Sequence, residues 1–116
     1  GKFSVEGGYQ AMEEILELKE LPTAVFCMGD EIAVGAMKAI KTAGLSVPDD
    51  FSIVGFDDIE ISQYLNPALT TVRQKKEEMG IEAADMVLDL INNQEEKIEP
   101  EIIDTELILR KSTKKL

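Results

Sequence analysis

Residues 51–64 read FSIVGFDDIEISQY. Its first part, FSIVGF, is short and largely apolar, which is typical of a β-strand buried in a parallel sheet. Two adjacent carboxylates, Asp57 and Asp58, follow at once. Acidic side chains beside a buried strand are costly unless they are solvated, paired or bound to something. The chain already carries a formal net charge of −11, so this pair needs an explanation.

Helix and strand signals alternate ahead of this run. The spacing of the apolar residues predicts an amphipathic helix over residues 5–19, with Ser4 as its N-cap. The apolar run TAVFCMG, residues 23–29, predicts another buried strand. A helix from Asp30 to Ala43 should follow and end at Gly44, in the left-handed conformation. This alternation predicts an α/β fold with a parallel sheet flanked by helices.

The alternation continues beyond residue 64. A short β-branched strand is expected at Thr70–Arg73, and a long helix with one apolar side over about residues 75–92. EIIDTELILR, residues 101–110, alternates and predicts a half-exposed final strand. The basic tail RKSTKKL, residues 110–116, is expected to be a solvated terminus. The chain opens on GKF directly before a helix, with no strand for that helix to follow, so we expect a fragment of a longer protein.

Composition excludes several classes of function. Twelve basic against 23 acidic residues argue against this stretch binding a phosphate backbone or an anionic membrane. No apolar run is long enough to span a membrane, and no signal peptide is visible. Histidine is absent, which removes most zinc sites and Ser-His-Asp catalysis. The single cysteine, Cys27, lies in an apolar run and is expected to be a buried core thiol.

Three segments of the chain should meet at the carboxyl-end edge of the sheet, where open parallel sheets bind ligands. Phe3 precedes the first helix, Gly29 and Asp30 follow one strand, and Asp57 and Asp58 follow the next. An aromatic ring with carboxylates suits a sugar, because the ring covers its apolar face and the carboxylates accept bonds from its hydroxyls. Asp57, the first residue beyond an apolar strand, is interpreted as a ligand-binding residue.

These residues also have structural interpretations. Asp30 could cap its helix, Phe3 could belong to the core, and Asp58 could hold a turn. A glycoside hydrolase with paired carboxylates is disfavoured, because adjacent residues of an extended segment point to opposite sides. A receiver-type Mg²⁺ site would need acidic residues from an earlier strand and a partner lysine. We therefore expect no catalytic residue, no metal and no cofactor.

The helix at residues 30–43 has more apolar surface than a helix lying on a sheet needs. A second apolar face suggests a second neighbour, and small residues such as Gly35 and Ala36 would allow close approach. Self-association and packing against another helix of the same chain both explain this. The apolar residues are Ile32, Ala33, Val34, Ala36, Met37, Ala39, Ile40 and Ala43.

Residues 22–74, which include VPDDFSIVGFDD and PALTTVRQ, resemble the effector-binding core of lac-repressor-type (LacI-family) transcriptional regulators. The segments GKF…GGYQAM, MGIEAADMVLDLI and TELILRKST are similar to the flanks of that core, so the resemblance covers essentially the whole chain. It implies a two-lobed, periplasmic-binding-protein-like (type I) fold with a small molecule between the lobes. About residues 1–71 and 96–111 would form part of the C-terminal lobe. The helix at about 75–92 would belong to the otherwise missing N-terminal lobe.

The resemblance implies the effector-sensing and dimerisation part of a sugar-responsive, cytoplasmic repressor. Its operator DNA would be bound by an N-terminal helix-turn-helix domain that this chain lacks, and effector would shift the equilibrium between DNA-competent and DNA-incompetent homodimers. Asp58 and the loop after it would shape the dimer side. By position, the effector-binding residues would be Phe3, Gly29 (polar in some members), Asp30, Asp57 and Gln74. The dimer interface would use Val34, Met37, Ile61, Tyr64 and Leu65.

Two alternatives remain. A periplasmic sugar-binding transport protein has the same fold, and a secretory signal upstream would favour it. A flavodoxin-like or receiver-like domain would bind flavin, Mg²⁺ or phosphate. PALTTVRQ and the helix with two apolar faces favour the regulator over both.

Overall fold

The computed structural model describes residues 4–74, 81, 83–85, 87, 88 and 105–115. The chain divides into two compact units, residues 1–73 with 107–116, and residues 74–106. The helix expected at about 75–92 falls in the second unit and lies largely outside the described residues, although residues 81, 83–85, 87 and 88 are helical.

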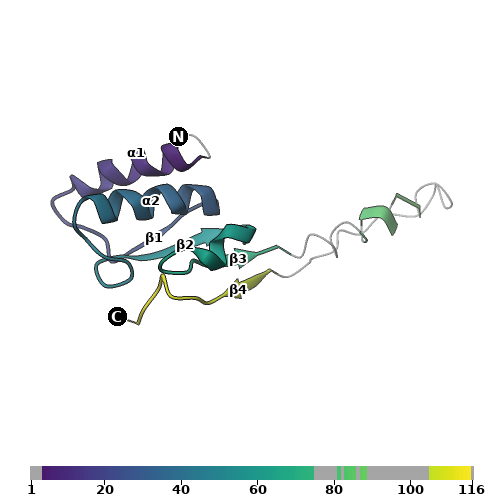
Figure 1. The fold of residues 1–116 in the computed structure, drawn as a ribbon. Coiled ribbons are helices and arrows are strands. Elements are labelled where there is room, and N and C mark those ends of the chain that lie inside the picture. Colours follow the sequence, from purple (N-terminus) through teal and green to yellow (C-terminus); the bar gives the residue numbers. More distant parts are fainter. Residues whose placement is uncertain (1–3, 75–80, 82, 86, 89–104, 116) are drawn as a thin grey trace. The chain divides into compact units, whose positions relative to one another are not determined.

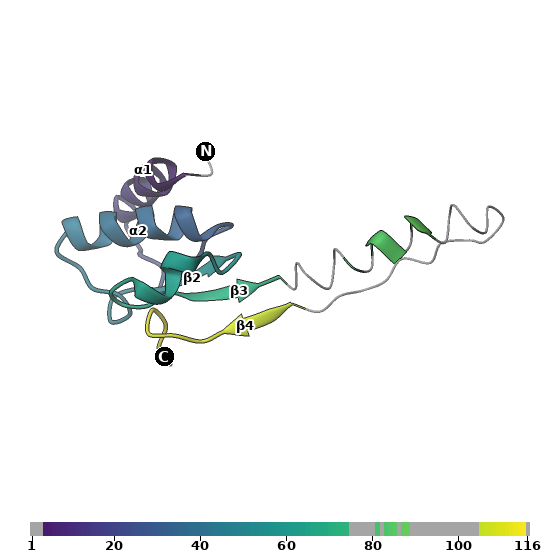
Figure 2. The ribbon, with the colours of Figure 1, turned by 45° about the vertical axis from the view of Figure 1, so that its right-hand side comes forward.

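The first unit is built on a four-stranded sheet in the order β1-β2-β3-β4. The strands are β1 (Ala24–Phe26), β2 (Ser52–Phe56), β3 (Thr70–Arg73) and β4 (Glu106–Ile108). The first three are parallel, with Val54 of β2 opposite both Phe26 and Thr70. β4 lies beside β3 and runs in the opposite direction (Figure 2). The predicted α/β fold with a parallel sheet is confirmed, and β3 has the predicted bounds.

Two helices, α1 (Val5–Leu16) and α2 (Asp30–Thr42), cover the same face of this sheet (Figure 1). The predicted N-cap of α1 is confirmed, because the Ser4 hydroxyl accepts a hydrogen bond from the Gly7 N–H at 3.0 Å. The predicted stop of α2 is also confirmed, since Gly44 adopts a φ of 82°. α1 is shorter than predicted and is capped by Glu17.

Glycines allow the backbones of α1 and α2 to touch. A Cβ at Gly35 of α2 would overlap the Val5 carbonyl oxygen, and a Cβ at Gly8 of α1 would overlap the Ile32 carbonyl oxygen. The small residues around Gly35 could have served self-association or packing against another helix of the same chain. At Gly35 the structure shows packing within the chain. α1 is the neighbour that uses this close approach.

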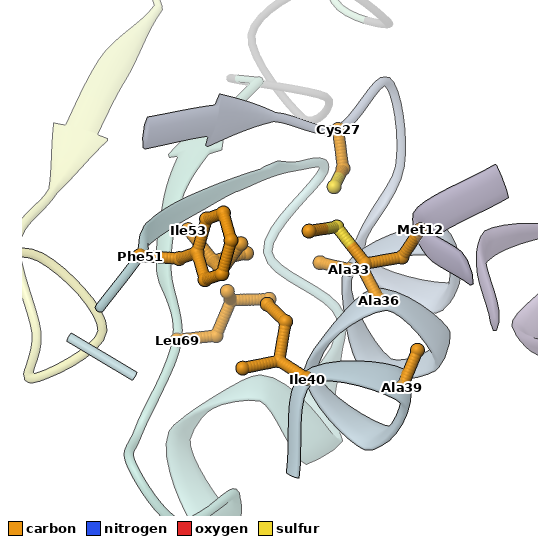
Figure 3. Close-up of a cluster of buried hydrophobic side chains, with 9 residues drawn as sticks. All are labelled: Met12, Cys27, Ala33, Ala36, Ala39, Ile40, Phe51, Ile53 and Leu69. Carbon is orange, nitrogen blue, oxygen red and sulfur yellow. The ribbon is translucent and has the colours of Figure 1, made fainter. Parts of the chain in front are cut away.

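The core lies between the two helices and the sheet, as Figure 3 shows. It joins residues far apart in sequence, and each larger side chain contributes about 1.5–3 kcal/mol by leaving water. Cys27 belongs to it, as predicted, and its burial, with a smaller effect of the Asp30 charge, raises the pKa of its thiol to about 11. The members are Met12, Cys27, Ala33, Ala36, Ala39, Ile40, Phe51, Ile53 and Leu69.

β1 is less buried than its sequence predicts. Phe26 is 59% exposed and Met28, just beyond the strand, is 68% exposed. The physical reason is position, because β1 is at the end of the strand order and pairs only with β2 among the described strands. The apolar run at residues 23–29 therefore predicted correctly that a strand forms there, but it predicted the burial of that strand wrongly. β4 is shorter and more exposed than predicted, because Glu106 and Leu107 are exposed, Leu107 at 59%, and of its three residues only Ile108 is half-buried.

The basic tail is not simply a solvated terminus. Ser112 is fully buried, its hydroxyl donates to the Ile53 carbonyl oxygen at 2.6 Å, and it accepts from the Thr70 N–H at 2.8 Å. The Ile53 N–H donates in turn to the Ser112 carbonyl oxygen. The tail thereby joins β2 to β3, while the neighbouring Lys111 and Lys114 stay exposed. The prediction held for the lysines and was wrong for Ser112.

Replacing Gly35 with alanine tests the contact between the helices. Helix propensity alone favours alanine by about 1 kcal/mol, whereas the overlap with Val5 should destabilise the chain by about 1–3 kcal/mol. Urea denaturation followed by circular dichroism measures the difference. Lys38→Ala, on the exposed side of α2, is the matched control and should stay within about 0.5 kcal/mol. A Gly35→Ala variant as stable as the unchanged chain would contradict the close packing.

Candidate site at the carboxyl ends of the strands

The loops after β1 and β2 lie at the same edge of the sheet, because the strands are parallel. Gly29 precedes α2, Asp30 is the first residue of α2, and Asp57 and Asp58 directly follow β2. The structure therefore brings together the two strand-end pairs that the sequence singled out. Phe3, the third predicted contributor, lies outside the described residues.

Asp57 and Asp58 have an uncommon backbone conformation. Their φ angles are 113° and 52°, a region that non-glycine residues rarely adopt. Such strain costs on the order of 1–3 kcal/mol per residue and persists only where surrounding contacts impose it. Strained non-glycine residues cluster at ligand-binding and active sites, so the geometry marks this edge as a candidate functional site.

Three successive N–H groups hold the strand-end loop, residues 57–59. The Asp57 N–H donates to the Val72 carbonyl oxygen at 2.8 Å, and the Asp58 N–H donates to Thr71 Oγ1 at 3.3 Å. The Ile59 N–H donates to Asp30 Oδ2 at 2.9 Å. Every residue of this loop is thus tied to β3 or to the start of α2, which explains how two strained residues are maintained.

Asp30 is the centre of these contacts. Its side chain is buried, with Oδ1 accepting from the Thr71 hydroxyl at 2.6 Å and Oδ2 from the Ser62 hydroxyl as well as from Ile59. A buried carboxylate is stable only with such donors. Gly55 leaves room for it, because a Cβ at that position would overlap Asp30 Oδ1.

The capping interpretation of Asp30 is wrong. The N-cap of α2 is Gly29, and the Asp30 carboxylate bonds to the η1 segment (Glu60–Tyr64), to the residue before it and to β3. The expectation that Asp30 also contacts an effector stays a prediction. Asp30 is 1% exposed and accepts hydrogen bonds from three donors of the chain. It therefore stabilises the strand-end loop from the interior of the protein.

Asp58 lies in an ionic cluster with two arginines. Its Oδ2 accepts from Arg73 Nε at 2.8 Å and its Oδ1 from Arg110 Nη2 at 2.9 Å. Arg110 also donates through Nη1 to the Leu69 carbonyl oxygen. Burial of the Asp58 carboxyl would by itself raise its pKa, but the hydrogen bonds and charges of the two arginines outweigh this and hold the pKa below its ordinary value.

The other predicted effector residues have different settings. Gly29 is half-buried, with φ near −170°, so its backbone conformation does not require glycine. Gln74 is half-buried and follows β3 as the first residue of the second unit. Asp57 is half-buried at the end of β2. Effector contacts for all of these stay predictions.

The residues predicted for a dimer interface lie on α2, on η1 and just after η1. Val34, Met37 and Leu65 line a hollow of about 490 Å³ beside the loop at residues 65–67. Ile61 is 54% exposed and Tyr64 is 73% exposed. The interface itself stays a prediction.

Sequence reasoning missed the residues that support the site. Thr71, Ser62 and Arg110 bond directly to Asp30 or Asp58, yet none was predicted to take part. Thr71 offered a weak signal, since a buried strand carrying two adjacent threonines must satisfy both hydroxyls. Among the described residues, no group of three or more His, Cys, Asp or Glu could hold a metal ion. Within the same residues, no helix has the length and apolarity needed to cross a membrane.

Residues 1–113 match the family model described as periplasmic binding protein-like domain. Because the match covers nearly the whole chain, the chain belongs to this family. Similar proteins of described function narrow the class of protein to which the chain is related. The chain is 47% identical over its whole length to the probable HTH-type transcriptional repressor ExuR of Bacillus subtilis, and spans 35% of that protein.

Solved structures agree with this assignment. A LacI family transcriptional regulator from Enterococcus faecium with bound ribose matches with a TM-score of 0.83 and 38% identity, covering 97% of this chain and 41% of the regulator. The lac repressor dimer bound to operator and the anti-inducer ONPF matches with a TM-score of 0.89 and 36% identity, covering 97% of this chain and 39% of the repressor. The predicted relationship to LacI-family regulators is confirmed. The chain spans about a third of the curated relative and about two fifths of these solved chains.

Asp58 should make stability depend on pH. Because its folded-state pKa is depressed, its contribution is fully present above the unfolded pKa of about 3.9 and is lost as pH falls through the folded value. Urea denaturation at a series of pH values should show the unchanged chain more stable than Asp58→Asn by about 1.5–3 kcal/mol near neutral pH. This difference should shrink below about pH 4.

The control for this series is Asp49→Asn. Asp49 pairs with Lys114 at 3.8 Å and its side chain is 80% exposed, so its removal should change little at any pH. A stability difference for Asp58→Asn that is the same at pH 7 and at low pH would contradict the role of the charge.

Proposed function

We propose that this chain is the sugar-sensing and dimer-forming part of a DNA-binding transcriptional repressor. One observation carries the proposal. Two consecutive strained aspartates follow the inner strand β2 at the ligand-binding edge of the fold, and three backbone N–H groups of their loop donate hydrogen bonds to β3 and to Asp30. A regulator with the same fold and 38% identity is described with bound ribose, which supports a sugar as the effector class.

In this proposal Asp57 is the main polar contact of this chain with the sugar. A carboxylate can accept hydrogen bonds from two neighbouring hydroxyls, and such charge-assisted bonds are stronger than neutral ones. Gly29 and Gln74 contribute from the loop after β1 and from the residue after β3. Phe3 covers the apolar face of the sugar ring. Asp30 keeps the strand-end loop in place.

The repressor function needs more than this chain. Operator DNA is bound by a separate helix-turn-helix domain in the intact protein, as the names of the repressor relatives suggest for their own chains. The relatives are repressors, which favours regulation over transport and over an enzyme. We accordingly place the intact protein in the cytoplasm, as a homodimer without a catalytic role or cofactor.

Sugar binding and its effect on DNA binding test the function together. Calorimetry of the intact protein against ribose, cellobiose and a panel of common monosaccharides should identify a binder. The same sugar should change the affinity for DNA fragments selected by the protein by about 5–150-fold, the usual range of allosteric coupling. A protein that binds a sugar but selects no DNA fragment would favour the transport alternative.

Asp57→Ala tests the assignment of the contact. Removing a hydrogen bond to a charged group should cost about 1.5–3 kcal/mol of sugar affinity, or about 10–150-fold. Calorimetric titration of the intact variant with the sugar found in the panel measures it, and circular dichroism verifies the fold. Asp49→Ala, on the exposed surface, is the matched control. Unchanged affinity in a folded Asp57→Ala protein would remove Asp57 from the site.

Val34→Asp tests the dimer face. If Val34 lies in a two-fold interface, the substitution buries an unpaired charge twice and should yield monomers in light scattering of the intact protein. Val5→Asp makes the same change on α1, where the side chain is 42% exposed, and should leave the dimer intact. A dimer that persists in Val34→Asp at the same concentration would place Val34 outside the interface.

A further inference from the structure

The ionic cluster of Asp58, Arg73 and Arg110, called here the Asp58 cluster, joins three separate parts of the first unit. Asp58 follows β2, Arg73 is the last residue of β3, and Arg110 follows β4. The two arginines occupy both carboxylate oxygens of Asp58, and the Asp58 side chain is only 9% exposed. The pair of Asp58 with Arg110, whose side chain is 16% exposed, is more buried than an ordinary surface ion pair, whereas the Arg73 side chain is 48% exposed.

Asp58 is adjacent to the residue proposed to bind the sugar. Both residues have positive φ angles, so the direction of Asp57 depends on a strained backbone that Asp58 shares. With its side chain fixed by two arginines and its N–H bonded to Thr71, Asp58 has little freedom to rotate. A change at Asp58 must therefore reach the backbone of Asp57.

The cluster also reaches the strands that border the second unit in sequence. β3 ends at Arg73, directly before residues 74–106, and the chain returns through β4 to Arg110. Arg110 is fixed further by its N–H, which donates to Thr70 Oγ1 at 2.9 Å, and by its bond to Leu69. Asp58 is thus the point at which the strand-end loop meets β3 and the segment after β4.

We propose that Asp58 is a positioning residue for effector recognition, which holds the strained backbone of Asp57 through its bonds to Arg73 and Arg110. This inference rests on the proposed function for its recognition step, while the positioning of Asp57 can be measured without any sugar. Asp58 itself makes no contact with the effector in this scheme. The cluster sets the direction of Asp57 and ties it to β3 and to the segment after β4.

Asp58→Asn is the sharpest variant, because an amide has the shape of the carboxylate but only one acceptor oxygen. One arginine then faces an N–H₂ group instead of an oxygen. In the intact protein, affinity for the sugar identified from the ribose and cellobiose panel should fall by about tenfold or more. Asp49→Asn, which removes the exposed pair with Lys114, should leave affinity unchanged.

A double-mutant cycle separates positioning from general destabilisation. Arg73→Gln should lower sugar affinity as well, and the Asp58→Asn, Arg73→Gln double variant should lose clearly less than the two single losses added together. Additive losses would mean that the two residues act independently and would overturn the proposal.

Hydrogen exchange supplies the measurement that needs no effector. In Asp58→Asn the Asp57 amide, which donates to Val72, should exchange about tenfold faster or more, while the Ile53 amide in the core should keep its protection. Faster exchange at Asp57 in a protein that binds no sugar from the panel would retain the positioning and remove the proposed function. Unchanged exchange at Asp57 together with unchanged affinity in folded Asp58→Asn would overturn the inference itself.

Discussion

The buried carboxylate of Asp30 is the constraint on which the rest of this site depends. One side chain at the start of α2 accepts hydrogen bonds from Ile59, Ser62 and Thr71, which belong to the strand-end loop, to η1 and to β3. Leaving any of these donors unpaired in the interior would cost about 1–3 kcal/mol, so the groups stabilise one another's placement. The strand-end loop, η1 and β3 are consequently fixed to a single point, and Gly55 supplies the space for it.

This arrangement relates the two surfaces assigned to the proposed function. The strand-end loop carries Asp57 at one end and leads directly into η1, which carries Ile61 and Tyr64 at the proposed dimer face. Asp30 bonds to both the loop and η1, so the position of one cannot change without affecting the other. A regulator needs a physical connection between its effector site and its dimer interface. Allostery requires that effector binding and subunit contact favour the same conformation of the protein.

Local sequence features predicted the elements well and their surroundings less well. Ser4, Gly44 and the β-branched run at residues 70–73 act through their own backbone or immediate neighbours, so their roles were predictable. The partners of Asp30 were not, because Thr71 and Ser62 lie 41 and 32 residues away and neither carries a local signal. Asp57 was predicted as a ligand-binding residue from its place after an apolar strand, but the positive φ angles of Asp57 and Asp58 depend on those distant partners.

Burial was predicted correctly from the sequence for Cys27 and wrongly for Phe26 and Ser112. The exposure of Phe26 follows from the place of β1 in the strand order, and the burial of Ser112 follows from a tail that joins β2 to β3. The apolar character of β1 and the basic character of the tail are local properties of the sequence. Burial depends instead on which parts of the chain pack against a residue. The family relationship, by contrast, could be recognised from sequence, because runs such as VPDDFSIVGFDD preserve the strand together with its loop.

The most direct test of the central claim is a crystal structure of the intact protein with the sugar selected from the binding panel. A sugar hydroxyl should donate to an Asp57 carboxylate oxygen at about 2.5–3.0 Å, with Asp30 still bonded to Thr71 and Ser62. A sugar bound elsewhere, with no contact to Asp57 or to the loop after β1, would contradict it.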